Sequence, residues 1–167
     1  MRFIAIAVVC GALVFGAGAS AAGGGGSANG GSFLTVHNVF GLQTLQLRVF
    51  GFNAKLQSDG SADGWFNYQE VDDGVPFHAN GSVWCLTVIG NEAWIGGTIE
   101  HANDPTYDGL GAWWHVTDNG EGPNDPPDLT TFLGVGSLAA TQAFCDNHPP
   151  YRFPFAIQGG NISVRPG

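Results

Sequence analysis

The chain has 167 residues, of which 44% are hydrophobic and 11% charged, and five basic residues stand against fourteen acidic ones for a net charge of −9. Phosphate backbones and anionic membrane surfaces are bound through clustered Lys and Arg, so this balance argues against nucleic acid as a partner and against binding to such surfaces. An acidic, weakly charged surface is an ordinary way for a β protein to stay soluble.

The N-terminus has the pattern of a secretory signal peptide. Arg2 precedes an apolar run over residues 3–17, and the sequence ASA at 19–21 supplies a small-residue cleavage signal. A membrane span is the alternative, but the run is shorter than the ~20 residues that cross a bilayer, and glycine interrupts it. We predict that residues 1–21 are removed and that the mature chain is secreted, to the periplasm or the medium, with no membrane span.

The next segment, residues 22–32, reads AGGGGSANGGS, which is typical of a flexible Gly/Ser linker. The folded part is therefore expected at residues 33–167. This length suits one domain with its own core, and neither a fixed-period repeat nor a second linker breaks it. We expect a monomer.

Strand patterns dominate the predicted domain. Runs rich in branched and aromatic residues, bounded by Gly, Asn and Asp turns, predict strands at 33–40, 45–56, 64–71, 112–118, 129–135, 152–157 and 162–165, besides a hairpin over 82–100. Only residues 137–144 resemble a short helix, with Ser137 as its N-cap. Eight or nine short antiparallel strands predict an all-β fold, either a β-sandwich or a closed β-barrel.

The hairpin is the clearest element. Its two-residue loop, Gly-Asn at 90–91, suits a type II′ turn between twisted strands. The resulting register pairs Leu86 with Ile95 and Trp84 with Gly97 on one face. That face is wholly apolar, so we expect it to point into the core.

Two cysteines, Cys85 and Cys145, remain after removal of the signal peptide. An even pair in a small secreted domain predicts a disulfide. A pair of buried free thiols and a metal site are the alternatives, and the metal site is disfavoured because no patterned histidine pair lies nearby.

Several segments together resemble a known family. The resemblance is carried by Cys145 and by four strings: FNAKLQSDGSADGWFNY from Phe52, VWCLTVIGNEAWIGG from Val83, VTDNGEGPNDPPD from Val116 and GGNISV from Gly159. They are similar to a widespread family of small secreted bacterial proteins with no assigned activity. The resemblance covers nearly all of the mature chain and implies a secreted all-β domain, but it implies no catalytic residue. The chain departs from the family pattern in a longer turn at 78–81 and in its tryptophan content.

An acidic loop is the first candidate site. Within eleven residues it holds six oxygen-bearing side chains: Asp118, Asn119, Glu121, Asn124, Asp125 and Asp128. Ca²⁺ takes six to eight oxygens from carboxylates, amides and backbone carbonyls, and this loop is dense in all three. The spacing is not that of an EF-hand, and the same residue types also make turns by bonding to their own backbone. A calcium site and a purely structural turn are the two interpretations.

Tryptophans form the second candidate site. An aromatic surface for sugars or for another protein would be drawn from Trp65, Trp94, Trp113 and Trp114. A place in the core is the alternative for most of them, because large aromatic rings dominate cores as well as interfaces.

Acid–base chemistry has a few candidate residues but no complete motif. They are the acids Glu70, Asp72 and Asp73 and the imidazoles His78 and His115. The sequence lacks a nucleophile-elbow serine, an HExxH motif and a paired-histidine spacing. We therefore predict a secreted, non-catalytic binding or structural domain with an unknown extracellular ligand or protein partner. A small secreted hydrolase or isomerase acting at a barrel mouth is the alternative.

Overall fold

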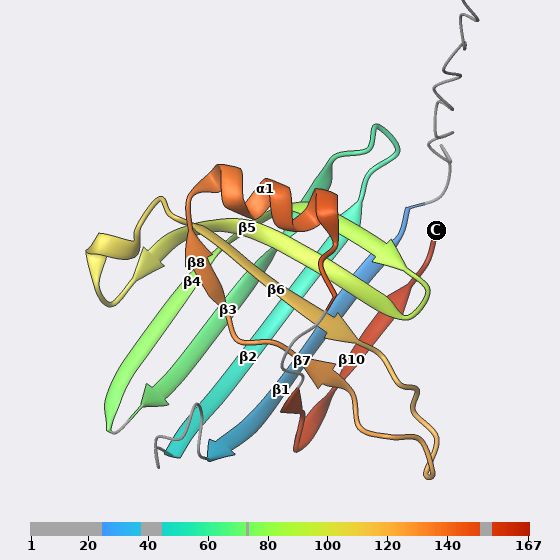
Figure 1. The fold of residues 1–167 in the computed structure, drawn as a ribbon, viewed down its shortest axis with the longest axis horizontal. Coiled ribbons are helices and arrows are strands. Elements are labelled where there is room, and N and C mark those ends of the chain that lie inside the picture. The colour runs from blue at the N-terminus through green and yellow to red at the C-terminus, as the bar shows by residue number, and fades with distance from the viewer. Residues whose placement is uncertain (1–24, 38–44, 73, 151–154) are drawn as a thin grey trace, which may run out of the picture.

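The computed structural model describes residues 25–37, 45–72, 74–150 and 155–167. Within these residues the strands form one antiparallel sheet that curls into a half-barrel (Figure 1). Its order is β10-β1-β2-β3-β4-β5-β6-β7-β9, and β8 pairs with β6. The predicted all-β antiparallel class is confirmed. Of the two predicted architectures, the structure is nearer to the barrel, because its strands form a single curled sheet.

Five long strands form most of the sheet: β1 (Ser27–His37), β2 (Leu45–Leu56), β3 (Ala62–Asp72), β4 (Val75–Ile89) and β5 (Glu92–Ala102). Five shorter ones complete it: β6 (Gly111–Thr117), β7 (Leu129–Thr130), β8 (Gly134–Gly136), β9 (Phe155–Ala156) and β10 (Gly159–Arg165). A 3-10 turn, η2 (Pro105–Tyr107), lies between β5 and β6. No helix in the described ranges is long and apolar enough to cross a membrane.

Strand β1 begins at Ser27, inside the segment predicted as a linker, so that prediction is wrong for residues 27–32. Strand β1 pairs with β10 on one side and with β2 on the other, so its backbone groups are hydrogen-bonded on both sides. A Cβ on Gly30 would come within 2.7 Å of the Asn161 carbonyl oxygen. Residues 1–24, which include the predicted signal peptide, lie outside the described part of the chain.

The core fills the concave side of the sheet. Trp114 lies at its centre, with ring centroids 5.7 Å from Phe52 and 5.4 Å from Phe66. Alternate residues of neighbouring strands surround it, as the two-residue period of a strand requires. Fully buried members include Ala28, Ile95, Ile99, Val116 and Ile162.

The hairpin of β4 and β5 has the predicted register from its turn down to Cys85, which pairs with Gly96. Gly90 has φ +60°, as a type II′ turn requires of its first central residue. Beyond Cys85 the register shifts, and Val83 rather than Trp84 pairs with Gly97. The prediction that Trp84 faces Gly97 is therefore wrong, because a bulge inserts one residue into β4.

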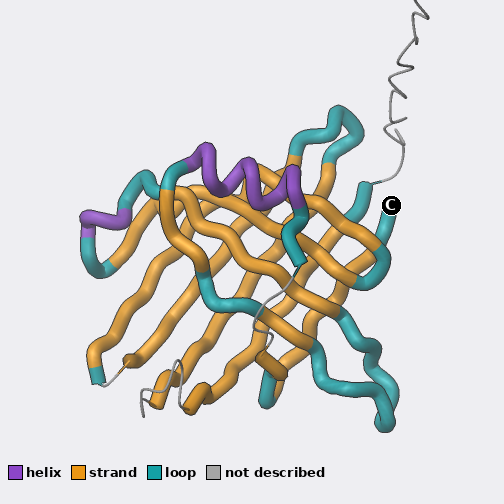
Figure 2. Tube along the Cα trace, in the orientation of Figure 1, coloured by secondary structure: helices purple, strands orange, loops and turns teal. Residues whose placement is uncertain are grey.

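The α-helix of the described residues, α1 (Leu138–Asn147), lies across the outer side of the curled sheet over β4, β5 and β6 (Figure 2). Ser137 caps it as predicted, accepting a hydrogen bond from the Ala140 amide at 3.1 Å. The helix runs past the predicted end at 144, to Asn147. His148 ends it in the left-handed conformation, with φ 33°.

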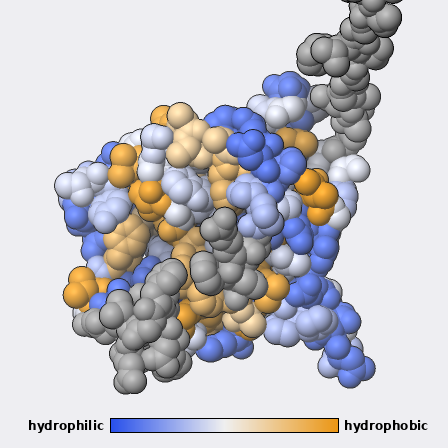
Figure 3. All heavy atoms as spheres, viewed as in Figure 1, coloured by the Kyte–Doolittle hydropathy of each residue, from blue (hydrophilic) through white to orange (hydrophobic). Residues whose placement is uncertain are grey.

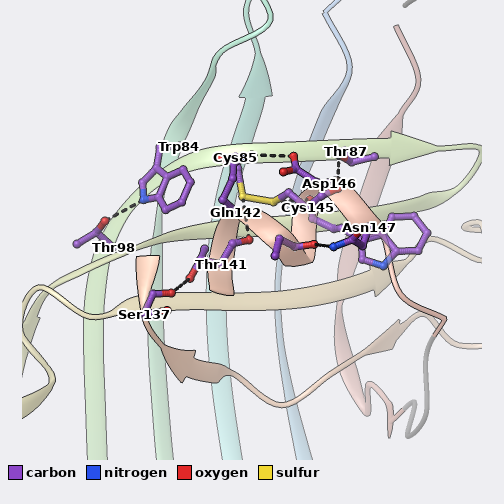
Figure 4. Close-up of a disulfide and its surroundings, with 12 residues drawn as sticks. Trp84, Cys85, Thr87, Thr98, Ser137, Thr141, Gln142, Cys145, Asp146 and Asn147 are labelled. Atoms are coloured by element: carbon purple, nitrogen blue, oxygen red, sulfur yellow. Dashed lines mark hydrogen bonds between the residues drawn. A yellow bond between two sulfur atoms is a disulfide. The ribbon is translucent and has the colours of Figure 1, made fainter. Parts of the chain in front are cut away.

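The disulfide between Cys85 and Cys145 joins α1 to β4, with the two Cα atoms 6.2 Å apart (Figure 4). Thr87 Oγ1 donates to the Cys145 carbonyl at 2.9 Å and strengthens the same junction. Gly96 lets the helix approach, because any Cβ there would collide with the Cys85 sulfur and the Thr141 methyl. The predicted cysteine pairing is confirmed.

Candidate functional site

The loop predicted to bind calcium, residues 118–128, joins β6 to β7 and projects as a hydrophilic arm at the lower right of Figure 3. Two of its carboxylates accept hydrogen bonds from backbone amides of β10. Asp118 Oδ2 accepts from the Val164 amide at 2.9 Å, and Asp128 Oδ2 accepts from the Ile162 amide at 2.8 Å. Because β10 starts the sheet order and β7 lies near its other end, these two carboxylates join the ends of the half-barrel. We call this pair the carboxylate clasp.

The other oxygen of each clasp carboxylate is also bonded. Asp118 Oδ1 accepts from the Gly120 amide at 2.9 Å, and Asp128 Oδ1 accepts from the Asn119 amide at 2.8 Å. Asp128 is 5% exposed, so its charge is held by backbone donors away from water. Both acids therefore act as structural acceptors.

Two of the other polar side chains of the loop bond within it, whereas Glu121 contacts β10. Asp125 Oδ2 accepts from the Gly122 amide at 2.6 Å, Asn119 donates to the Pro127 carbonyl, and Glu121 accepts from the Asn161 side chain. Asn124 is exposed. Across the described residues, no group of three or more His, Cys, Asp or Glu side chains is placed to hold a metal ion. This arrangement gives no support to the predicted calcium site. It supports the interpretation of the loop as a structural turn.

The four tryptophans do not share a surface. Trp114 is buried in the core, whereas Trp94 is buried on the outer side beneath α1, where its Nε1 donates to the Pro149 carbonyl at 3.0 Å. Trp113 packs on Phe144 of α1, with ring centroids 6.2 Å apart. Only Trp65 is largely exposed, at 54%. A single aromatic platform built from all four residues is therefore wrong.

The candidate acid–base residues are also dispersed. His115 is buried on the outer side of β6, with its ring centroid 4.3 Å from that of Trp94 and its Nε2 3.2 Å from Glu92 Oε2. His78 is exposed on β4, and Asp73 lies outside the described residues. Burial lowers the pKa of His115 from its usual 6.5, and the Glu92 carboxylate partly opposes that shift.

Stability is expected to fall as the pH drops from 8 towards 6. At pH 8 the His115 imidazole is neutral in the folded and in the unfolded protein. Near pH 6.5 it takes up a proton in the unfolded chain but not in the folded protein, because the pKa of His115 is lower in the folded state. Urea unfolding at pH 8, 7 and 6 measures the slope, and His115→Gln should flatten it. An unchanged slope in the variant would contradict this role of His115.

A cavity of about 960 Å³ opens at one end of the half-barrel, between the β3–β4 hairpin and η2. Its wall combines aromatic rings, aliphatic side chains and acids, namely Tyr68, Glu70, Asp72, Val75, Pro76, Phe77, Asn103, Asp104, Tyr107, Leu110, Leu133 and Val135. We call this cavity the mouth. Deeper inside, a second cavity of about 20 Å³ shares Tyr68 and Leu133 with it and has little more room than one water molecule.

The floor of the mouth is a closed polar triad. Arg48 on β2 lies directly across from Glu70 on β3, and its Nη2 donates to Glu70 Oε1 at 2.9 Å. Tyr68, two residues before Glu70 and so on the same face, accepts from Arg48 Nε at 2.9 Å and donates to Glu70 Oε2 at 2.7 Å. Burial raises the pKa of Tyr68 well above its usual value of 10, so the phenol keeps its proton. The Arg48 guanidinium also lies 3.7 Å from the Phe132 ring centroid.

The rim of the mouth carries uncompensated negative charge. Glu70 is neutralised by Arg48, but within the described residues neither Asp72 nor Asp104 has an ion-pair partner. Asp72 Oδ1 is buried and has no hydrogen-bond partner there. Beside these acids, Phe77 stands between two phenol rings, with its centroid 6.3 Å from Tyr68 and 5.1 Å from Tyr107. The mouth is thus an aromatic slot with acids at its edge.

The described part of the chain is an all-β half-barrel. A disulfide-linked helix lies on its outer side, and the mouth, an acidic and aromatic cavity, opens at its end. Comparisons with protein-family models, with curated proteins and with solved structures find no match. The mouth could not be predicted from the sequence because its residues come from three separate stretches of the chain, 68–77, 103–110 and 133–135. The one available signal was the alternation of Tyr68, Glu70 and Asp72 on β3, which places all three on one face.

Proposed function

We propose that the protein is a secreted, non-catalytic binding domain whose mouth takes a small molecule with an apolar, ring-containing body and a basic amino group. The observation that carries this proposal is that Asp72 and Asp104, which have no ion-pair partner among the described residues, share the wall of the mouth with the Phe77 and Tyr107 rings. Secretion is supported by the predicted signal peptide and by the disulfide, which persists in oxidising compartments.

The chemistry of the wall selects the ligand class. Aromatic and aliphatic side chains favour an apolar body, and cations are attracted to aromatic faces. An ammonium group would donate hydrogen bonds to the carboxylates in this wall and would offset the charges of Asp72 and Asp104. A carboxylate ligand would meet like charge and is disfavoured.

Catalysis is the weaker alternative for the same cavity. Glu70 is engaged by Arg48 and Tyr68, and the high pKa of Tyr68 makes the phenol a poor proton donor at neutral pH. The described wall of the mouth holds no histidine, cysteine or serine. A hydrolase or isomerase would have to rely on the carboxylates of Asp72 and Asp104, so binding is the better account.

A pair of matched ligands tests the proposal. We expect 2-naphthylmethylamine to bind in a calorimetric titration, and Asp72→Asn to weaken its binding at least tenfold through loss of the charge-assisted hydrogen bond, since 1.4 kcal/mol is a factor of ten. Asp59→Asn is the control, because Asp59 is exposed in the β2–β3 turn and should leave binding unchanged.

The anion 2-naphthoate has the same ring system and should bind far more weakly. Equal binding of amine and anion would overturn the ligand class. Absence of binding by either compound at millimolar concentration would overturn the proposal that the mouth is a binding site of this kind.

A further inference from the structure

We infer that the outer face of β1, β2 and β3 around Trp65 is a second binding site, for a chain of neutral sugar units. This face lies on the opposite side of the sheet from the core and away from α1, which covers β4, β5 and β6. Its ligand would be an extracellular glycan. The site is independent of the mouth.

Trp65 provides the stacking surface. A Cβ placed on Gly51 would lie 3.7 and 3.8 Å from two carbons of the six-membered ring of the Trp65 indole, so this ring extends over the backbone of the neighbouring strand. With 54% of its surface exposed, the indole presents a flat apolar area to solvent. Tryptophan is enriched at recognition surfaces because it offers a large rigid face. The C–H face of a pyranose ring complements such a surface.

Amide side chains surround the indole. Asn53 lies directly opposite Trp65 on β2, and Asn29 lies opposite Asn53 on β1. Two residues further along β3, Asn67 lies opposite Asn80 of β4 on the same outer face. Asn53, Asn67 and Asn80 are exposed, and Asn29 is half-buried. Each amide offers two donors and one acceptor oxygen, which match the paired hydroxyls of a sugar.

The shape and charge of this face narrow the ligand further. Neighbouring strands are ~4.8 Å apart, so the amides step away from Trp65 in a row across the sheet and suit an extended chain rather than one small molecule. The next outward residues, Lys55 and Asp63, are direct cross-strand partners whose opposite charges offset each other. Exposed apolar side chains, Phe33, Leu47, Val49 and Val71, lie further along the strands on the same face. The part around Trp65 thus carries amides, one indole and one offset charge pair, and it fits hydroxyl-rich chains better than anionic polymers, which require clustered Lys and Arg.

Four neutral hexasaccharides are suitable probes: cellohexaose, chitohexaose, xylohexaose and mannohexaose. We expect at least one to bind, with a change in tryptophan fluorescence, and Trp65→Ala to weaken that binding at least tenfold. Asn67→Ala should weaken it several-fold through loss of hydrogen bonds. Ile89→Ala is the matched control, because Ile89 is also an exposed apolar residue but lies at the far β4–β5 turn.

Melting curves of the variants establish that they are folded, since Trp65 and Asn67 are surface residues. Asp72→Asn should leave hexasaccharide binding unchanged, and Trp65→Ala should leave 2-naphthylmethylamine binding unchanged, so the two sites are tested separately. If none of the four chains binds at millimolar concentration, or if Trp65→Ala binds them as tightly as the native protein, the inference is wrong.

Discussion

Replacing both cysteines of the disulfide with serine should lower the free energy of unfolding by about 4 kcal/mol, the value expected when a cross-link closes a loop of this length. Cys85 and Cys145 are 60 residues apart in sequence. The helix also depends on this bond, because only Thr141 and Cys145 of α1 are buried. Denaturant unfolding of Cys85→Ser/Cys145→Ser without reductant measures the loss.

Trp94 offers a local readout of the same change. It lies beneath α1, and its exposure to water should increase if the helix loosens, which shifts its fluorescence to longer wavelength. Gln142→Ala is the control on the exposed side of α1. An unfolding midpoint equal to that of the oxidised native protein would show that the bond contributes no stability.

Asp128→Asn should lower the free energy of unfolding by about 3 kcal/mol, because hydrogen bonds to a buried charged group contribute roughly 1.5 to 3 kcal/mol each. An asparagine has only one acceptor oxygen, so one of two backbone amides, Asn119 or Ile162, would face an N–H group instead. Hydrogen exchange of the Ile162 amide should report the opening of the carboxylate clasp.

Asp125→Asn is the matched control in the same loop, because Asp125 is exposed and bonds only within the loop. We expect it to cost well under 1 kcal/mol. Thermal unfolding in calcium and in chelator separates the clasp from a metal site, since a metal that binds only the folded state raises the melting temperature with concentration. A calcium-dependent rise that Asp128→Asn abolishes would contradict the purely structural role of this acid.

Local patterns predicted much of the fold. The period of two along β3, the Gly90 turn and the Ser137 cap are read from neighbouring residues, and the elements that they indicate are present. The hairpin register follows from its turn as far as Cys85. It fails at the bulge, because a one-residue insertion in one strand leaves no signal in the alternation of apolar residues.

Features that depend on distant partners escaped prediction. Ser27–Ser32 has the composition of a linker, yet it pairs with β10 and β2, where small residues permit close approach of backbones. The clasp acids bond to amides 34 and 46 residues away, and the sequence does not show these partners. The local density of acids in the loop therefore suggested a metal site instead. Conversely, Trp65 and Trp94 both lie on the outer side of the sheet. The exposure of Trp65 and the burial of Trp94 depend on which strands α1 covers, and sequence periodicity does not reveal this.

The proposed function is tested most directly by a crystal structure of the mature protein with 2-naphthylmethylamine. We predict that the naphthyl ring lies in the mouth against Phe77 and Tyr107, and that the ammonium group donates to the Asp72 carboxylate within 3.2 Å. A mouth without ligand in crystals where the compound is bound elsewhere, or a ligand whose amine points away from Asp72 to solvent, would contradict the account.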